Sequence, residues 1–167
     1  MNCPHCHVPS FITSEYETVE IDQCKQCHGI WLDHNEITEI VNNLATDFSE
    51  LDIKKTVSNA FMGIPKDEFK KERPCPKCSE AMAPINYTID SGVIIDRCPN
   101  DHGVWLDFFE LEQVQQYREY WQESAKKTIG HFTQLAQSVD KDSNDKDSSI
   151  SLIYDLSIKV ASKIFKK

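Results

Sequence analysis

The seven cysteines of this 167-residue chain constrain its fold most strongly, because all of them fall into two copies of one spaced pattern. Each copy opens with a Cys-Pro-x-Cys turn, at residues 3–6 and again at residues 75–78. Each continues, about twenty residues later, with a second cysteine-bearing turn that runs into Gly-x-Trp-Leu-Asp, at residues 24–33 and 98–107. Two tight turns at this spacing bring four side chains to one tetrahedral metal ion. The pattern therefore predicts a repeated module with one metal centre in each copy.

Each copy spans about forty residues, which is too few to bury the apolar surface that a stable core requires. The metal ion must then supply part of the folding free energy. We expect removal of one metal ion to unfold its own module only. Disulfides are disfavoured, because seven cysteines is an odd number and the spacing is typical of metal ligands. The chain opens without a secretory leader, and no apolar run approaches the roughly twenty residues that cross a bilayer, so we expect a cytoplasmic protein and no membrane partner.

The formal net charge of -9 argues against binding to a phosphate backbone. Residues 1–45 hold one basic residue, Lys25, against seven acids. Thiolate ligands add further negative charge, because a dication does not balance four of them. A nucleic-acid partner is therefore unfavourable on charge, and we expect the partner to be a protein.

Between the cysteine turns the residues alternate as in a β-hairpin. In the second copy, strands 85–89 and 93–95 flank a turn at 90–92. After each Trp-Leu-Asp a helix is expected to begin with a capping box, formed by Asp33 with Glu36 and by Asp107 with Glu110. The predicted helices run over about 34–45 and over about 107–139.

Turn, hairpin and Gly-x-Trp-Leu-Asp tail together resemble the TFIIB-type zinc-ribbon domain, in two tandem copies over about residues 3–39 and 75–111. The resemblance implies zinc binding and, by the family's name, a link to transcription. The expected fold is small α+β, with two zinc-ribbon hairpin modules each followed by a helix, a long helix, and a C-terminal amphipathic helix.

Two zinc ions per chain are expected at these ribbons. The first is assigned to Cys3, Cys6, Cys24 and Cys27, and the second to Cys75, Cys78 and Cys98 with a fourth ligand that is not a cysteine. Alignment of the two glycines places Asp101 where the first copy has its fourth cysteine. The fourth ligand is thus His102 or Asp101, and we favour His102 because imidazole is the commoner structural ligand. His28 occupies the matching place in the first copy, and we expect it to share a hydrogen-bonding role outside the ligand set with His102.

Trp31 and Trp105 can shield the cysteine turns or stack against nucleic-acid bases. Shielding is the better explanation, because a ribbon has almost no core of its own. A catalytic centre would need an open coordination position and a general base. Asp107 and Glu110 are better explained as helix caps, so no residue is predicted to be catalytic.

The rest of the chain divides by composition. The predicted segments are 1–45, the first ribbon with its helix; 46–73, a helical connector with a helix over 49–62; 74–139, the second ribbon with the long helix; 140–149, a flexible linker; and 150–167, an amphipathic helix. Apolar residues recur at alternating three- and four-residue steps along the long helix and form an apolar seam on one face. Such a seam is typical of a helix that packs against a partner helix. That partner is either another part of this chain or, by self-association through 107–139, a second copy.

These features predict a non-enzymatic zinc-binding protein that acts as a protein-interaction or regulatory module. Two alternatives stay open: a metal- or redox-responsive zinc protein, in which the irregular second site loses zinc more readily, and a nucleic-acid-binding factor associated with transcription. The C-terminal segment 150–167 is the predicted docking element, which binds this protein or another one in preference to an anionic membrane surface.

Overall fold

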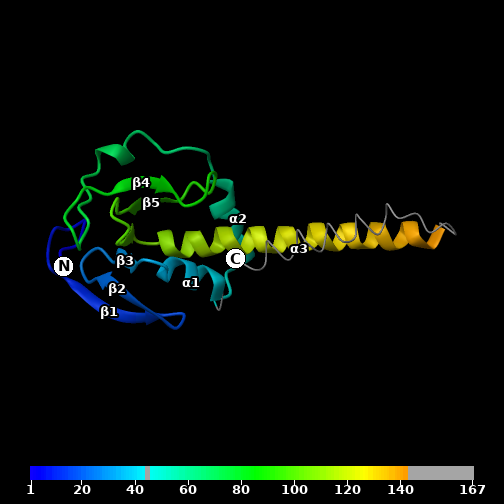
Figure 1. The fold of residues 1–167 in the computed structure, drawn as a ribbon, viewed down its shortest axis with the longest axis horizontal. Coiled ribbons are helices and arrows are strands. Elements are labelled where there is room, and N and C mark those ends of the chain that lie inside the picture. The colour runs from blue at the N-terminus through cyan, green and yellow to red at the C-terminus, as the bar shows by residue number, and fades with distance from the viewer. Residues whose placement is uncertain (44–45, 143–167) are drawn as a thin grey trace. The chain divides into compact units, whose positions relative to one another are not determined.

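The computed structural model describes residues 1–43 and 46–142, with side chains placed up to residue 135. It divides into two units, Met1–Tyr120 and a second that begins at Trp121. The elements in chain order are β1 Phe11–Tyr16, β2 Val19–Cys24, β3 Ile30–Asp33, α1 Glu36–Asn43, α2 Glu50–Ser58, the 3-10 helix η1 Glu68–Lys70, β4 Ala83–Asn86, β5 Ile94–Arg97, β6 Gly103–Leu106 and α3 Glu110–Asp142 (Figure 1). This is the small α+β fold that the sequence predicts.

The first ribbon is a three-stranded antiparallel meander. Strands β1 and β2 pair from Phe11 with Cys24 to Tyr16 with Val19, and β3 returns along β2. The connection is a two-residue turn in which Glu17 and Thr18 both have positive φ, 47° and 70°. A turn with two positive φ values matches the twist of the strands that it joins. This hairpin delivers Cys24 to the second cysteine turn at the end of β2.

The second ribbon repeats the meander with shifted strands, since β4 covers 83–86 where 85–89 was predicted and β5 covers 94–97 where 93–95 was predicted. The side chain of Asn86 accepts hydrogen bonds from the Ser91 hydroxyl, at 2.6 Å, and from the Gly92 N–H, at 3.1 Å. These bonds close the loop before the predicted strand 85–89 can continue. Gly92 has a φ of 74°, and a Cβ there would lie 2.8 Å from the Asn59 carbonyl oxygen. The connector is therefore packed against this loop.

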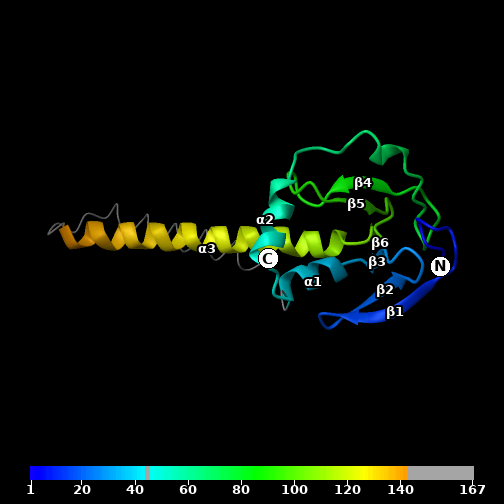
Figure 2. The ribbon, with the colours of Figure 1, turned by 180° about the vertical axis from the view of Figure 1, so that it is seen from behind.

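Strands β3 and β6 join the two ribbons into one sheet of order β1-β2-β3-β6-β5-β4 (Figures 1 and 2). Ile30 pairs with Leu106, Leu32 pairs with Val104, and Trp31 pairs with its own counterpart, Trp105. Two equivalent strands paired in this register are related by an approximate two-fold axis between the tryptophans. The expectation that loss of one metal unfolds only its own ribbon stays a prediction, although a shared sheet favours coupling between the ribbons.

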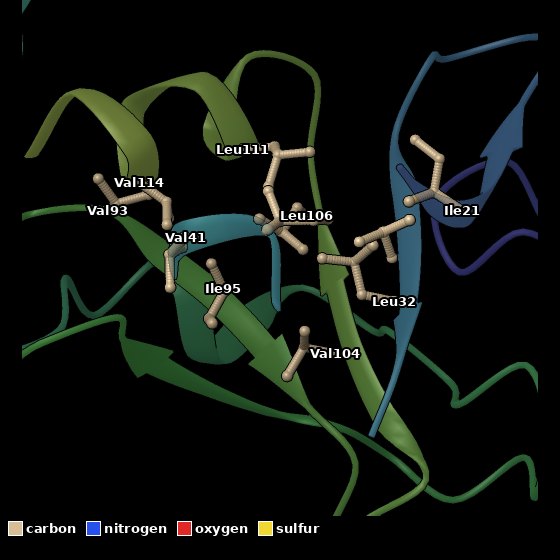
Figure 3. Packing of buried hydrophobic residues seen from close by; sticks show 11 residues of the cluster. Ile21, Leu32, Val41, Val93, Ile95, Val104, Leu106, Leu111 and Val114 are labelled. Carbon is tan, nitrogen blue, oxygen red and sulfur yellow. The ribbon is translucent and has the colours of Figure 1, made fainter. Parts of the chain in front are cut away.

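One face of the sheet carries the apolar core of the first unit. Strand residues including Ile21, Leu32 and Leu106 pack there with helix residues from α1 and from the start of α3 (Figure 3). Ile40 in α1 and Val114 in α3 are fully buried in this cluster. The first turns of the predicted helical seam are thus covered by this chain itself.

The opposite face carries the cysteine turns. Cys3, Cys24, Cys75 and Cys98 are buried in one cluster with Trp31 and Trp105, so both sets of metal-ligand candidates share a single apolar environment. The two indoles are almost completely buried, with exposed fractions of 1% and 0%. This confirms that the tryptophans shield the turns.

Helix boundaries differ in places from the predicted ones. Helix α1 begins at Glu36 rather than at residue 34. Helix α2 ends at Ser58, short of the predicted residue 62, although the predicted cap is present, since Ser49 accepts from the Asp52 N–H at 3.2 Å. Helix α3 extends to Asp142, so its last three residues lie in the segment 140–149 that was predicted to be a linker.

The five predicted chain segments stay a prediction about organisation. The rest of the linker and the amphipathic segment 150–167 lie outside the described residues. Within the part of the chain that the structure describes, no helix is both long enough and apolar enough to span a bilayer.

Candidate metal centres

The first candidate metal centre brings together the four cysteines predicted for it. Cys3, Cys6, Cys24 and Cys27 each offer a sulfur, and these atoms all lie within 4.8 Å of one another. Cys3 Sγ and Cys27 Sγ are 3.6 Å apart, although they come from different turns. The Cys6 N–H donates to Cys3 Sγ at 3.3 Å, which fixes the first turn around its own ligand.

The second centre gathers Cys75, Cys78, Cys98 and His102 within the same limit. Its imidazole Nδ1 faces two sulfurs, at 3.5 Å from Cys98 Sγ and 3.9 Å from Cys75 Sγ. Cys78 Sγ and Cys98 Sγ are 3.7 Å apart. The ligand set predicted with His102 is therefore the one that the fold assembles.

Both groups fit a zinc ion. Zn–S bonds of about 2.3 Å and Zn–N bonds of about 2.1 Å in a tetrahedron separate neighbouring ligand atoms by roughly 3.6–3.8 Å. The contacts of Cys3 with Cys27, Cys78 with Cys98 and Cys98 with His102 match that spacing. Four protein donors complete the coordination at each centre. Zinc bound there would supply folding free energy, and these residues would hold it.

Asp101, the alternative fourth ligand, is engaged away from the sulfurs. Its carboxylate accepts from Arg97 Nη2 at 2.8 Å and lies 3.1 Å from His34 Nδ1. These partners lower the pKa of Asp101, the Arg97 hydrogen bond contributing most. Asp101 also has a φ of 58°, a conformation that aspartate tolerates. It thus shapes the turn and leaves the ligand position to the next residue.

His28 and His102 do not share the role expected for them. His102 enters the ligand group, whereas the His28 ring lies 5.5 Å from the Phe108 ring, and the His28 carbonyl oxygen accepts from Gln23 Nε2 at 3.3 Å. The first centre has a cysteine in the position before this histidine, so its imidazole is available for a contact outside the centre.

The protein environment raises the pKa of some cysteine thiols and lowers the pKa of others. Burial raises the pKa of Cys3, and it raises the pKa values of Cys6 and Cys75 to about 11 each. Burial opposes ionisation of Cys24 too, but hydrogen bonds from the Ser10 hydroxyl and from backbone N–H groups lower its pKa to about 6. A backbone hydrogen bond from Glu80 and a side-chain bond from Asn100 lower the pKa of Cys78 to about 6. Zinc must displace the remaining thiol protons, so its affinity falls as the solution becomes more acidic.

The aspartate of each Gly-x-Trp-Leu-Asp tail holds the tryptophan of its own ribbon. Trp31 Nε1 donates to Asp33 Oδ1 at 2.6 Å, and Trp105 Nε1 donates to Asp107 Oδ1 at 2.9 Å. Half of each predicted capping box is present, since the aspartate N–H donates at 2.7 Å to the carboxylate three residues later. The aspartate side chain satisfies the buried indole N–H instead of capping. The Trp-x-Asp spacing carried this signal, which sequence reasoning missed.

The same aspartates receive a basic side chain from the first cysteine turn of the other ribbon. Lys77 Nζ lies 2.6 Å from Asp33 Oδ2, and His5 Nδ1 lies 3.5 Å from Asp107 Oδ1. Lys77 and His5 occupy matching places, between the two cysteines of their turns. Each metal-binding turn is thus held against the helix start of the opposite ribbon.

The glycines of the two tails make room for the tryptophan of the other ribbon. A Cβ on Gly29 would lie 2.2 Å from Trp105 Cζ2, and a Cβ on Gly103 would lie 2.8 Å from Trp31 Cζ2. Real side chains do not approach so closely. The Gly-x-Trp-Leu-Asp motif therefore specifies the packing between the two ribbons as well as the fold of each ribbon.

A buried charged cluster lies at the second ribbon and has no counterpart at the first among the described residues. Arg73, with a 6% exposed fraction, donates to Asp107 Oδ2 at 2.6 Å and lies 3.6 Å from Asp96 Oδ2. Desolvation raises the pKa of Asp96 to about 6 and that of Glu110 to about 8. The matching position in the first ribbon, two residues before Cys3, holds Met1, whose side chain carries no charge. The cluster distinguishes two otherwise similar copies.

Comparison with known proteins agrees with this geometry. A family model described as transcription factor zinc-finger, of the TFIIB zinc-ribbon type, matches residues 2–43 and 74–116, slightly more than half of the chain. The two matched stretches contain all eight residues of the two metal-ligand groups. No curated protein and no solved structure matches the chain.

Proposed function

The chain belongs to the transcription factor zinc-finger family, with two tandem zinc ribbons, and from this premise we propose that it is a non-enzymatic zinc protein that acts as a protein-interaction module. The observation that carries the proposal is the completeness of both centres. Each has four protein ligand atoms within 4.8 Å of one another, and four such ligands are the mark of structural zinc sites. A zinc ion held in this way stabilises a surface and leaves no coordination position for a substrate.

The paired ribbons support the same role by their rigidity. Both metal centres are fixed in one unit by a continuous sheet, two reciprocal glycine contacts, the ion pair of Lys77 with Asp33 and the contact of His5 with Asp107. A rigid frame loses little conformational entropy when a partner binds. The unit therefore suits presentation of a surface.

Nucleic-acid binding is the second candidate, and the family description favours it. The charge opposes it, since phosphate contacts need clustered lysine and arginine, and the formal net charge is -9. Trp31 and Trp105, the tryptophans of the two ribbons, are buried and cannot stack on bases. A redox-responsive role, the third candidate, rests on the mixed ligand set of the second centre.

The test is affinity capture from the native host with the zinc-loaded full chain, a chain ending at residue 149, and a chain in which Cys6 and Cys78 are serine. If the proposal is right, the full chain reproducibly captures one host protein at physiological salt, and the cysteine variant no longer captures it. Loss with the shortened chain assigns docking to 150–167. Recovery of DNA or RNA in a strongly salt-dependent manner would replace the proposal with the second candidate. Release of zinc from the second centre alone under mild oxidant would favour the third.

A further inference from the structure

Three aromatic rings from both ribbons form a surface cluster beside the first metal centre. Phe108 and Phe109, between β6 and α3, are 52% and 55% exposed, and their ring centroids lie 3.9 Å apart. The His28 ring lies 5.5 Å from the Phe108 ring and follows the ligand Cys27 directly. We refer to His28, Phe108 and Phe109 as the aromatic patch. Adjacent, half-exposed phenylalanines are unfavourable in water unless something covers them.

Phe109 is also strained. Its φ is 73°, in the left-handed region that bulky side chains rarely adopt. Asn35 holds the matching position in the first ribbon with nearly the same φ, 78°, and asparagine adopts this conformation readily. The backbone thus requires a left-handed conformation at the residue before the helix, and this conformation is less favourable for phenylalanine than for asparagine. Strain kept at an exposed position points to binding rather than to folding.

The approximate two-fold axis allows the aromatic patch to be compared with the equivalent corner of the other ribbon. Phe108 matches His34, and His34 lies 3.1 Å from Asp101, which also accepts from Arg97 at 2.8 Å. The corner that corresponds to the aromatic patch is therefore a polar, charged cluster. Sheet, turn and helix start are built in both places, so the fold does not require aromatic side chains there.

The negative charge of the adjacent first centre favours a cationic ligand. Four thiolates and one zinc ion leave the first centre with a formal charge of about -2, against about -1 for three thiolates and an imidazole. Residues 1–45 add seven acids against the single Lys25. Open aromatic faces beside negative charge attract cations. We propose that the aromatic patch binds a positively charged side chain, arginine above all, on a protein partner. This inference rests on the proposed interaction function and names its surface.

The test exchanges the patch for the residues that the first ribbon has at the same positions. Phe108→His with Phe109→Asn should leave two zinc ions per chain and the far-UV circular dichroism unchanged, because His34 and Asn35 already serve this backbone. The probe is a nonapeptide of alternating arginine and glycine, measured by calorimetry with the zinc-loaded full chain at about 0.15 M salt. We expect the double variant to bind it at least about tenfold more weakly. Phe69→His removes another phenylalanine, 64% exposed, and should change the affinity less than about twofold.

Equal binding by the double variant would overturn the inference, because net charge alone would then explain the affinity. Equal or tighter binding of the matching glutamate peptide or of oligothymidylate would also overturn it. The capture experiment separates the two proposals: if the host protein is still captured by the double variant, this surface is wrong while the interaction function stands. If neither the host protein nor the peptide binds the wild-type chain, the interaction function itself is wrong.

Discussion

Trp31 and Trp105 are paired directly across β3 and β6, and the approximate two-fold axis of the first unit passes between them. Each indole is fixed by the aspartate two residues further on, and each lies against the glycine of the other ribbon. The pair lies in the same buried cluster as cysteines of both metal centres. Disturbance of one centre should therefore reach the other through these rings.

Zinc binding at the two centres should be coupled. In Cys6→Ser the first turn loses a ligand, and His5 loses its fixed position against Asp107. We expect zinc affinity at the second centre to fall by roughly tenfold, a coupling free energy of about 1.4 kcal/mol. Chelator competition would measure the affinity, and hydrogen exchange would follow β4 to β6. Unchanged affinity and protection in the second ribbon would show that the ribbons are independent.

The ligand assignment of the second centre predicts a graded response. His102→Ala should remove the fourth ligand and lower the zinc content from two ions per chain toward one. Asp101→Ala should retain both ions, because it removes only exposed contacts with Arg97 and His34, which water and salt screen. His28→Ala should also retain both. Metal analysis of freshly reduced protein decides, and a larger loss from Asp101→Ala would reverse the assignment.

Gly29→Ala should be strongly destabilising. The new methyl group would lie 2.2 Å from Trp105 Cζ2 and 3.0 Å from the Leu106 carbonyl oxygen, and neither the buried ring nor the backbone can move away freely. We expect a loss of about 1–3 kcal/mol in the free energy of unfolding. Gly130→Ala is the matched control, because its new methyl group would have no described residue within 4 Å and helix α3 should gain about 1 kcal/mol. Similar thermal midpoints for the two variants would contradict the reciprocal packing.

Glu110 should make stability fall as the pH rises. Desolvation raises its pKa from 4.5 to about 8, with Asp107 and Asp96 adding to the rise and Lys71 opposing it. Below about pH 4.5 the carboxyl is protonated in both states and its full contribution is present. Between 4.5 and 8 only the unfolded state loses the proton, so stability decreases across that window.

Glu110→Gln removes this titration and keeps an acceptor for the Asp107 N–H. We expect it to stabilise the zinc-loaded protein at pH 8 by about 2 kcal/mol relative to wild type, with little difference near pH 5. Denaturant unfolding at several pH values measures this. An equal effect of the substitution at both pH values would show that Glu110 does not keep its proton in the folded state.

The cysteine spacing and the Gly-x-Trp-Leu-Asp tails were enough to predict the zinc ribbons, their hairpins and the residues of both centres, because metal geometry is a local constraint set by short turns. Charge alone could not exclude Asp101 as a ligand. That choice depended on Arg97 and His34, and His34 comes from the other ribbon.

Only the tertiary structure decided what the two copies do to each other. Trp31 and Trp105 were predicted to be buried, but their pairing across one sheet, the fit of each into the glycine of its neighbour, and the ion pair of Lys77 with Asp33 join residues far apart in sequence. Periodicity and motif spacing describe contacts within a turn or a strand and say nothing of which surfaces meet. The sequence by itself therefore determined two ribbons, and the packing of one against the other, which depends on the shape of both, made them a single unit.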